Sequence, residues 1–144
     1  MDGKLDWTRL ADLIQTSAFD CHYTSEAAGR EINGAGFPCT WQKGDLGYRG
    51  ITVFRMGGTP HEWLVLPGTD GEKTLLDFTI GYHLAARSRI TIAVALSAFN
   101  PLWVVSHPDF QYRLHEAHYW DALAGLWVNP TPVNPPVLLW SKSD

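Results

Sequence analysis

Four short apolar segments, separated by turn-forming residues, constrain the fold of this chain more than any other feature of its sequence. They are rich in β-branched and aromatic residues: FPCTWQ (37–42), YRGITVFRM (48–56), EWLVLP (62–67) and KTLLDFTI (73–80). The separators KGDLG, GGTPH and GTDGE contain the glycine, proline and aspartate that favour tight turns. Short strands joined by such turns predict an antiparallel meander.

Two helices are predicted before the meander. LDWTRLADLIQTSAF carries aliphatic residues at roughly helical spacing, so we expect an amphipathic helix that ends near Thr16. In CHYTSEAAGREINGAGFP the apolar residues again fall on one side. The run Gly34–Gly36, followed by Phe-Pro, is typical of a helix end. The second helix therefore runs from near Cys21 to near Asn33.

The second half of the chain has weaker patterns. YHLAARSR (82–89) is compatible with a short helix, and ITIAVALSAF (90–99) with either a buried strand or a helix. FQYRLHEAHYWDALAGLW (110–127) predicts a third helix, and VLLW (137–140) an edge strand in a tail rich in proline. Residues 1–144 are therefore expected to form one α+β domain, with N-terminal helices packed on an antiparallel sheet.

Composition and charge exclude several classes of function. A chain of 144 residues can form a core without disulfides or a metal. The formal net charge of −4, with no basic stripe, argues against nucleic acid or an anionic membrane as partner. No run is long enough to span a membrane, and the N-terminus lacks the apolar core of a secretion signal. With only Cys21 and Cys39 there is no disulfide framework, so we expect a cytoplasmic protein; export without a cleavable signal is the alternative.

Cys21, His61 and Asp77 form the candidate catalytic group. Cys21 opens a predicted helix, where backbone N–H groups and the helix dipole favour the reactive thiolate. His61 begins a predicted strand and Asp77 lies in the next one. Adjacent antiparallel strands can hold two such side chains side by side, and a helix packed over them would bring the thiol to the imidazole. The expected result is a nucleophile, a general base and an orienting carboxylate.

These residues resemble the core of the transglutaminase-like cysteine enzymes, which have a papain-like fold. CHYTSEAAGREINGAGFPCTW is similar to the family's cysteine-led helix and its turn into a strand. HEW is similar to its His-x-Trp strand start, and LLDFT to its strand ending in Asp-x-Thr. The order Cys–His–Asp and both spacings agree with the family, and the resemblance covers about residues 19–80.

The resemblance implies a hydrolase or acyltransferase that acts on the amide bonds of a protein or peptide substrate. Cys21 would be the nucleophile, His61 the base and acid, and Asp77 the residue that fixes the imidazole. Trp63 would shield the imidazole or line the substrate cleft, and no cofactor or metal is implied. Where family members have a small residue or tryptophan before the cysteine, this chain has Asp20, which is a favoured N-cap residue.

Other interpretations of the same residues stay open. Cys39, within a strand that looks internal, is best explained as a small buried side chain, and each member of the candidate group has a structural explanation of this kind. The domain would then be a non-catalytic binding module whose many aromatic rings form a contact surface. A third possibility is a metal-dependent hydrolase that uses His107, His115 and His118.

Overall fold

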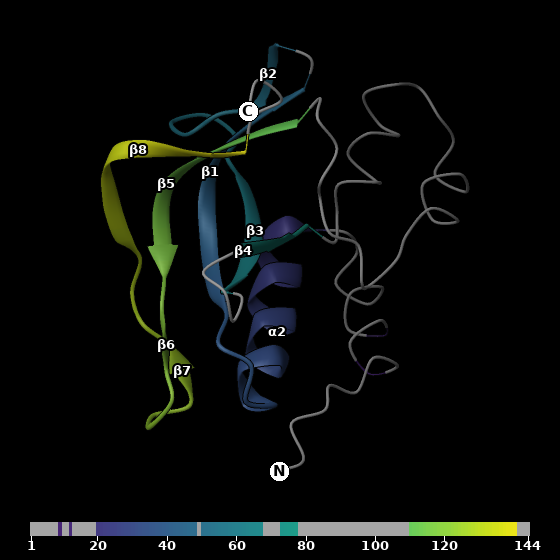
Figure 1. Ribbon diagram of the computed structural model, residues 1–144, viewed down its shortest axis with the longest axis vertical. Helices are drawn as coiled ribbons and strands as arrows, with labels where there is room; N and C mark the ends of the chain where they lie inside the picture. The colour runs from purple at the N-terminus through teal and green to yellow at the C-terminus, as the bar shows by residue number, and fades with distance from the viewer. Residues whose placement is uncertain are drawn as a thin grey trace.

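A computed structural model describes residues 9, 12, 20–48, 50–67, 73–77 and 110–140. These residues have an α+β architecture, in which a helix packs on an antiparallel sheet (Figure 1). Arg9 and Asp12 are helical. The rest of the predicted first helix, the GTDGE turn and the segments 82–99 lie outside the described residues. The elements are α2 (Cys21–Gly34), β1 (Thr40–Tyr48), β2 (Ile51–Phe54), β3 (His61–Pro67), β4 (Lys73–Leu76), β5 (Phe110–His118), β6 (Trp120–Asp121), β7 (Leu126–Trp127) and β8 (Thr131–Trp140).

Strand β1 is the centre of the sheet, whose strands run in the order β4-β3-β1-β5-β8 with β2 also paired to β1. All of these pairs are antiparallel. Strands β2 and β3 pair with successive parts of β1: β2 with residues 46–48 and β3 with residues 40–44. The predicted GGTPH turn lies between them, so β3 begins at His61, opposite Gly44. The expected antiparallel pairing is therefore confirmed over the described residues, but the strand order is not that of a simple meander, because β3 pairs with β1 and not with β2.

The KGDLG segment, predicted to be a turn, belongs instead to β1. A Cβ atom on Gly44 would lie 1.8 Å from the carbonyl oxygen of Arg113, so the glycine allows β1 and β5 to approach closely at a bulge. The aspartate of this segment, Asp45, accepts a hydrogen bond from the backbone N–H of Met56 and so holds the loop before β3. The turn-forming residues here serve strand pairing, because close backbone approach also requires glycine.

The helix predicted over residues 110–127 is wrong. The segment forms β5 and the β6–β7 hairpin. Its burial has a period of two at the start of β5, where Gln111 and Arg113 are exposed while Tyr112 and Leu114 are buried. Pairing with β1 and β8 on either side favours this strand over the competing helical pattern. The predicted edge strand VLLW is confirmed as the end of β8.

Helix α2 was predicted correctly and lies along the sheet beside β3 and β1 (Figure 1). Ala28 and Ile32 of the helix are fully buried against the sheet. Their partners in this core are the side chains of Cys39, Trp41, Leu64 and Leu76. At Gly29 a Cβ atom would lie 2.5 Å from the ring of Trp127, so this glycine allows the β6–β7 hairpin to pack closely against α2. Within the described part of the chain, no helix is long and apolar enough to cross a membrane.

Candidate active site

His61 and Asp77 form a buried ion pair at one end of the sheet. The His61 Nε2–H donates to Asp77 Oδ2 over 2.5 Å, and both side chains are almost completely inaccessible to solvent. Asp77 directly follows β4, which pairs with β3, and so the strand pairing brings the carboxylate to the imidazole. The charge of this buried carboxylate is therefore compensated by a partner 16 residues earlier in the chain.

Cys21 contacts the same imidazole from the first residue of α2. Burial alone lowers the pKa of His61, but the charge of Asp77, its hydrogen bond and the hydrogen bond and charge of Cys21 together raise that pKa to about 10. The structure thus brings the three sequence-predicted residues together, from the start of a helix, the start of a strand and the end of another.

Aromatic rings enclose the imidazole. Phe54 stacks on it with ring centroids 5.1 Å apart, and the rings of Trp63 and Tyr112 lie 6.1 and 6.3 Å away. All three rings are buried. Their arrangement excludes water from the ion pair, which strengthens its electrostatic interaction.

Tyr112 is a member of the site that the sequence analysis missed. Its hydroxyl donates to Asp77 Oδ2 over 2.7 Å, so this oxygen accepts from both the tyrosine and His61. Burial, followed by the charge and hydrogen bond of Asp77, raises the pKa of Tyr112 well above its ordinary value. The residue was missed because the segment around it was interpreted as a helix. A period-two interpretation of FQYRL would have placed the tyrosine on the buried face of a strand.

Of the two roles expected for Trp63, shielding the imidazole agrees with its position and lining an open cleft does not. Its side chain is 1% exposed, its indole N–H donates to the side-chain oxygen of Gln42, and its ring packs edge-on against Tyr112. A side chain this deeply buried cannot line an open cleft. Trp63 instead belongs to the aromatic enclosure of His61, because alternation along β3 places residues 61 and 63 on the same face.

Asp20 is the N-cap of α2. Its Oδ1 accepts from the backbone N–H groups of His22 and Tyr23, and its backbone is extended, with φ −77° and ψ 118°. The carboxylate before Cys21 is therefore held by the helix start, as expected for an aspartate at this position. Cys39 lies in a different environment from Cys21: it is buried, and burial raises the pKa of its thiol to about 12. The prediction that Cys39 is a buried core side chain is confirmed.

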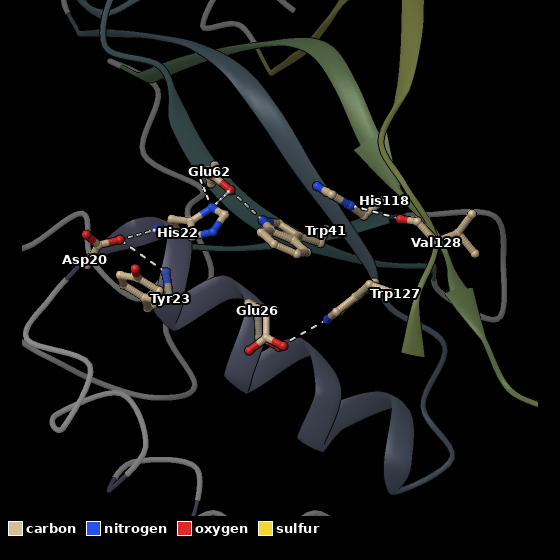
Figure 2. Close-up of polar contacts among 9 residues, drawn as sticks. All are labelled: Asp20, His22, Tyr23, Glu26, Trp41, Glu62, His118, Trp127 and Val128. Atoms are coloured by element: carbon tan, nitrogen blue, oxygen red, sulfur yellow. Dashed lines mark hydrogen bonds and ion pairs between the residues drawn. The ribbon is translucent and has the colours of Figure 1, made fainter. Parts of the chain in front are cut away.

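A second histidine–carboxylate pair lies beside the first. His22 follows Cys21 and Glu62 follows His61. The His22 Nδ1 atom lies 3.0 Å from Glu62 Oε1 and 3.1 Å from Glu62 Oε2, and the Trp41 indole N–H donates to Glu62 Oε1 over 2.8 Å. Figure 2 shows His22 and Trp41 converging on this carboxylate from the helix and from the sheet. Two successive residues of α2 thus contact two successive residues of β3.

Of the three histidines considered as metal ligands, the two that the structure describes, His115 and His118, contact different partners. The His115 Nε2 atom bonds to Asp45 Oδ2 over 2.9 Å. His118 stacks on Trp41 and donates from Nδ1 to the carbonyl oxygen of Val128 (Figure 2). On a helix, the spacing of His115 and His118 would place them on one face. On strand β5 the two side chains contact different partners. His107 lies outside the described residues, among which there is no cluster of three or more metal-ligating side chains.

Comparison of the chain with protein-family models, with curated proteins and with solved structures finds no match.

Proposed function

We propose that this chain is a cysteine-dependent acyl-transfer enzyme with a transglutaminase-like core. The observation that carries the proposal is the contact of Cys21 and Asp77 with the His61 imidazole. A pKa of about 10 keeps this imidazole protonated at neutral pH, so it can stabilise a neighbouring thiolate. The Asp77 carboxylate and the Tyr112 hydroxyl bonded to it hold the ring in place. This arrangement supports the assignment of Cys21, His61 and Asp77 to the roles of a Cys–His–Asp triad.

The proposed reaction has two steps. The Cys21 thiolate attacks the carbonyl carbon of an amide, and the backbone N–H groups at the helix start stabilise the oxyanion. Collapse breaks the C–N bond, and the leaving amine takes the proton of the His61 imidazolium, which leaves a thioester on Cys21. His61 then accepts a proton from the attacking water or amine, and the thiolate departs. Water gives hydrolysis or glutamine deamidation, whereas an amine gives transamidation.

The test compares the reactivity of the two cysteines, and Cys39 serves as the internal control for Cys21. Native protein is treated with iodoacetamide between pH 6 and 9, and labelling of each cysteine is followed by peptide mass spectrometry. We expect Cys21 to react at neutral pH and Cys39 to stay unlabelled, because burial keeps its thiol protonated and inaccessible. His61→Gln and Asp77→Asn should each lower the rate of Cys21 alkylation at pH 7 by about tenfold or more, because each weakens the stabilisation of the Cys21 thiolate by the His61 imidazolium.

Equal, slow labelling of both cysteines in the wild-type protein would contradict the proposal and favour a non-catalytic binding module. Activity is then tested on casein, with ammonia release and incorporation of a fluorescent primary amine as separate readouts. Cys21→Ala should abolish either activity, and Cys39→Ala should preserve it. Loss of activity with a chelator but not with Cys21→Ala would instead support a metal-dependent hydrolase.

A further inference from the structure

We propose that His22 is a positioning residue, which, through its bond to Glu62, holds the Cys21 end of α2 in register with His61. This inference rests on the proposed function, since positioning matters only if the thiol of Cys21 is the nucleophile. Cys21 contacts His61, while His22 contacts Glu62, so the helix start is tied to β3 at two adjacent points.

Burial makes the Glu62 contact specific. The Glu62 side chain is 7% exposed, and desolvating a carboxylate is unfavourable unless hydrogen-bond donors replace water. Trp41 supplies one donor from β1, and His22 supplies the other from α2. A shift of the helix along the strand would separate His22 from Glu62, so the carboxylate opposes that shift.

The setting of His22 explains why the contact acts on the helix start in particular. Its backbone N–H is held by the Asp20 cap, and its ring lies 5.3 Å from Tyr23 and 5.2 Å from Trp41 (Figure 2). The ring is 51% exposed, and so it lies at the surface beside Cys21, which is itself only partly buried. His22 therefore fixes the first turn of α2 from both its main chain and its side chain.

The test compares Cys21 alkylation in three variants at pH 7 and at pH 10. His22→Leu removes the donor, whereas His22→Asn keeps an N–H donor near the position of Nδ1. His115→Leu is the matched control, because His115 also bonds to a carboxylate, Asp45, on another part of the sheet. We expect His22→Leu to lower the rate at pH 7 by about tenfold. His22→Asn should recover most of that loss, and His115→Leu should have no effect.

Each outcome decides the inference. An ordinary thiol, with a pKa of about 8.5, reacts as the thiolate at pH 10 without help from a neighbouring imidazole. The deficit of His22→Leu should therefore be smaller at pH 10 than at pH 7, and a deficit of the same size at both pH values would overturn the inference. A wild-type rate for His22→Leu at pH 7 overturns the inference, and so does equal slowing by His22→Asn. Slow wild-type labelling that is indifferent to His61→Gln would instead show that the proposed function has failed.

A measurement on the unmodified protein covers the case in which His22→Leu does not fold. Long-range ¹H–¹⁵N spectra of protein labelled with ¹⁵N-histidine report which ring nitrogen carries the proton. The bond to Glu62 predicts that the neutral ring of His22 is protonated on Nδ1. The Nε2-protonated form would overturn the proposed contact.

Discussion

At the scale of single residues, the site depends on how a few polar atoms share their partners. Asp77 Oδ2 accepts from both His61 and Tyr112, and Glu62 Oε1 accepts from both His22 and Trp41. In each case a buried carboxylate is satisfied by an imidazole and by a second, neutral donor. Sharing of this kind restrains the direction of the imidazole, because the oxygen it contacts is already fixed by the other donor.

Tyr112→Phe should test this restraint at Asp77. Removing the hydroxyl takes one donor from a buried carboxylate, so we expect a loss of about 2 kcal/mol in the free energy of unfolding. We also expect a severalfold slower alkylation of Cys21 at pH 7, because the His61 ring loses part of its support. Urea denaturation and peptide mass spectrometry measure the two effects. Tyr23→Phe, at an exposed tyrosine, should change neither quantity, and an unchanged unfolding free energy in Tyr112→Phe would contradict the role given to its hydroxyl.

At the scale of elements, the site depends on where β1 places the start of β3. Gly44 pairs with His61 on one side and with Leu114 of β5 on the other. The position where β5 approaches β1 closely, Gly44, is therefore directly opposite His61 on the neighbouring strand. Helix α2 depends on Gly29 in a comparable way, because Trp127 packs against the helix at that position and donates to the carbonyl oxygen of Glu26 (Figure 2).

Gly44→Ala should disturb this close approach. Its Cβ atom would meet the backbone of Arg113, which cannot move without breaking the pairing of β1 with β5. We expect a loss of at least about 2 kcal/mol in the free energy of unfolding, measured by urea denaturation. Gly34→Ala is the matched control: nothing lies within 4 Å of its Cβ position, and alanine favours the last turn of α2. If both substitutions had the same effect on stability, the requirement for close approach at Gly44 would be wrong.

At the scale of the whole molecule, the buried ion pair links stability to pH. The pKa of His61 is about 10 in the folded protein and about 6.5 as a free side chain. The folded state therefore binds this proton more tightly than the unfolded state, and the stabilisation is complete below about pH 6.5. It is lost as pH rises through the folded pKa.

Urea denaturation between pH 6 and pH 9 should detect this loss. The slope contributed by His61 should approach about 1.4 kcal/mol per pH unit above its unfolded pKa. His61→Gln should remove that slope, whereas His115→Gln should leave it. Stopping at pH 9 avoids ionisation of tyrosines in the unfolded chain. A wild-type stability that rises with pH over this range would contradict the assigned shift.

The sequence by itself determined the features that depend on neighbouring residues. The span of α2, its cap by Asp20 and the strand that begins at His61 follow from local spacing. The choice of Cys21, His61 and Asp77 as candidates follows from motif resemblance. Helix caps, turns and strand periods act over a few residues, which is why they can be predicted without coordinates.

Only the tertiary structure decided what lies across the sheet. Tyr112 is 35 residues from Asp77, and His22 is 40 residues from Glu62, so no local pattern joins them. The burial of Trp63 and the formation of β5 in place of a helix also depend on strands supplied by distant segments. These features are set by pairing and desolvation, and both arise only when the folded chain brings separated residues into contact.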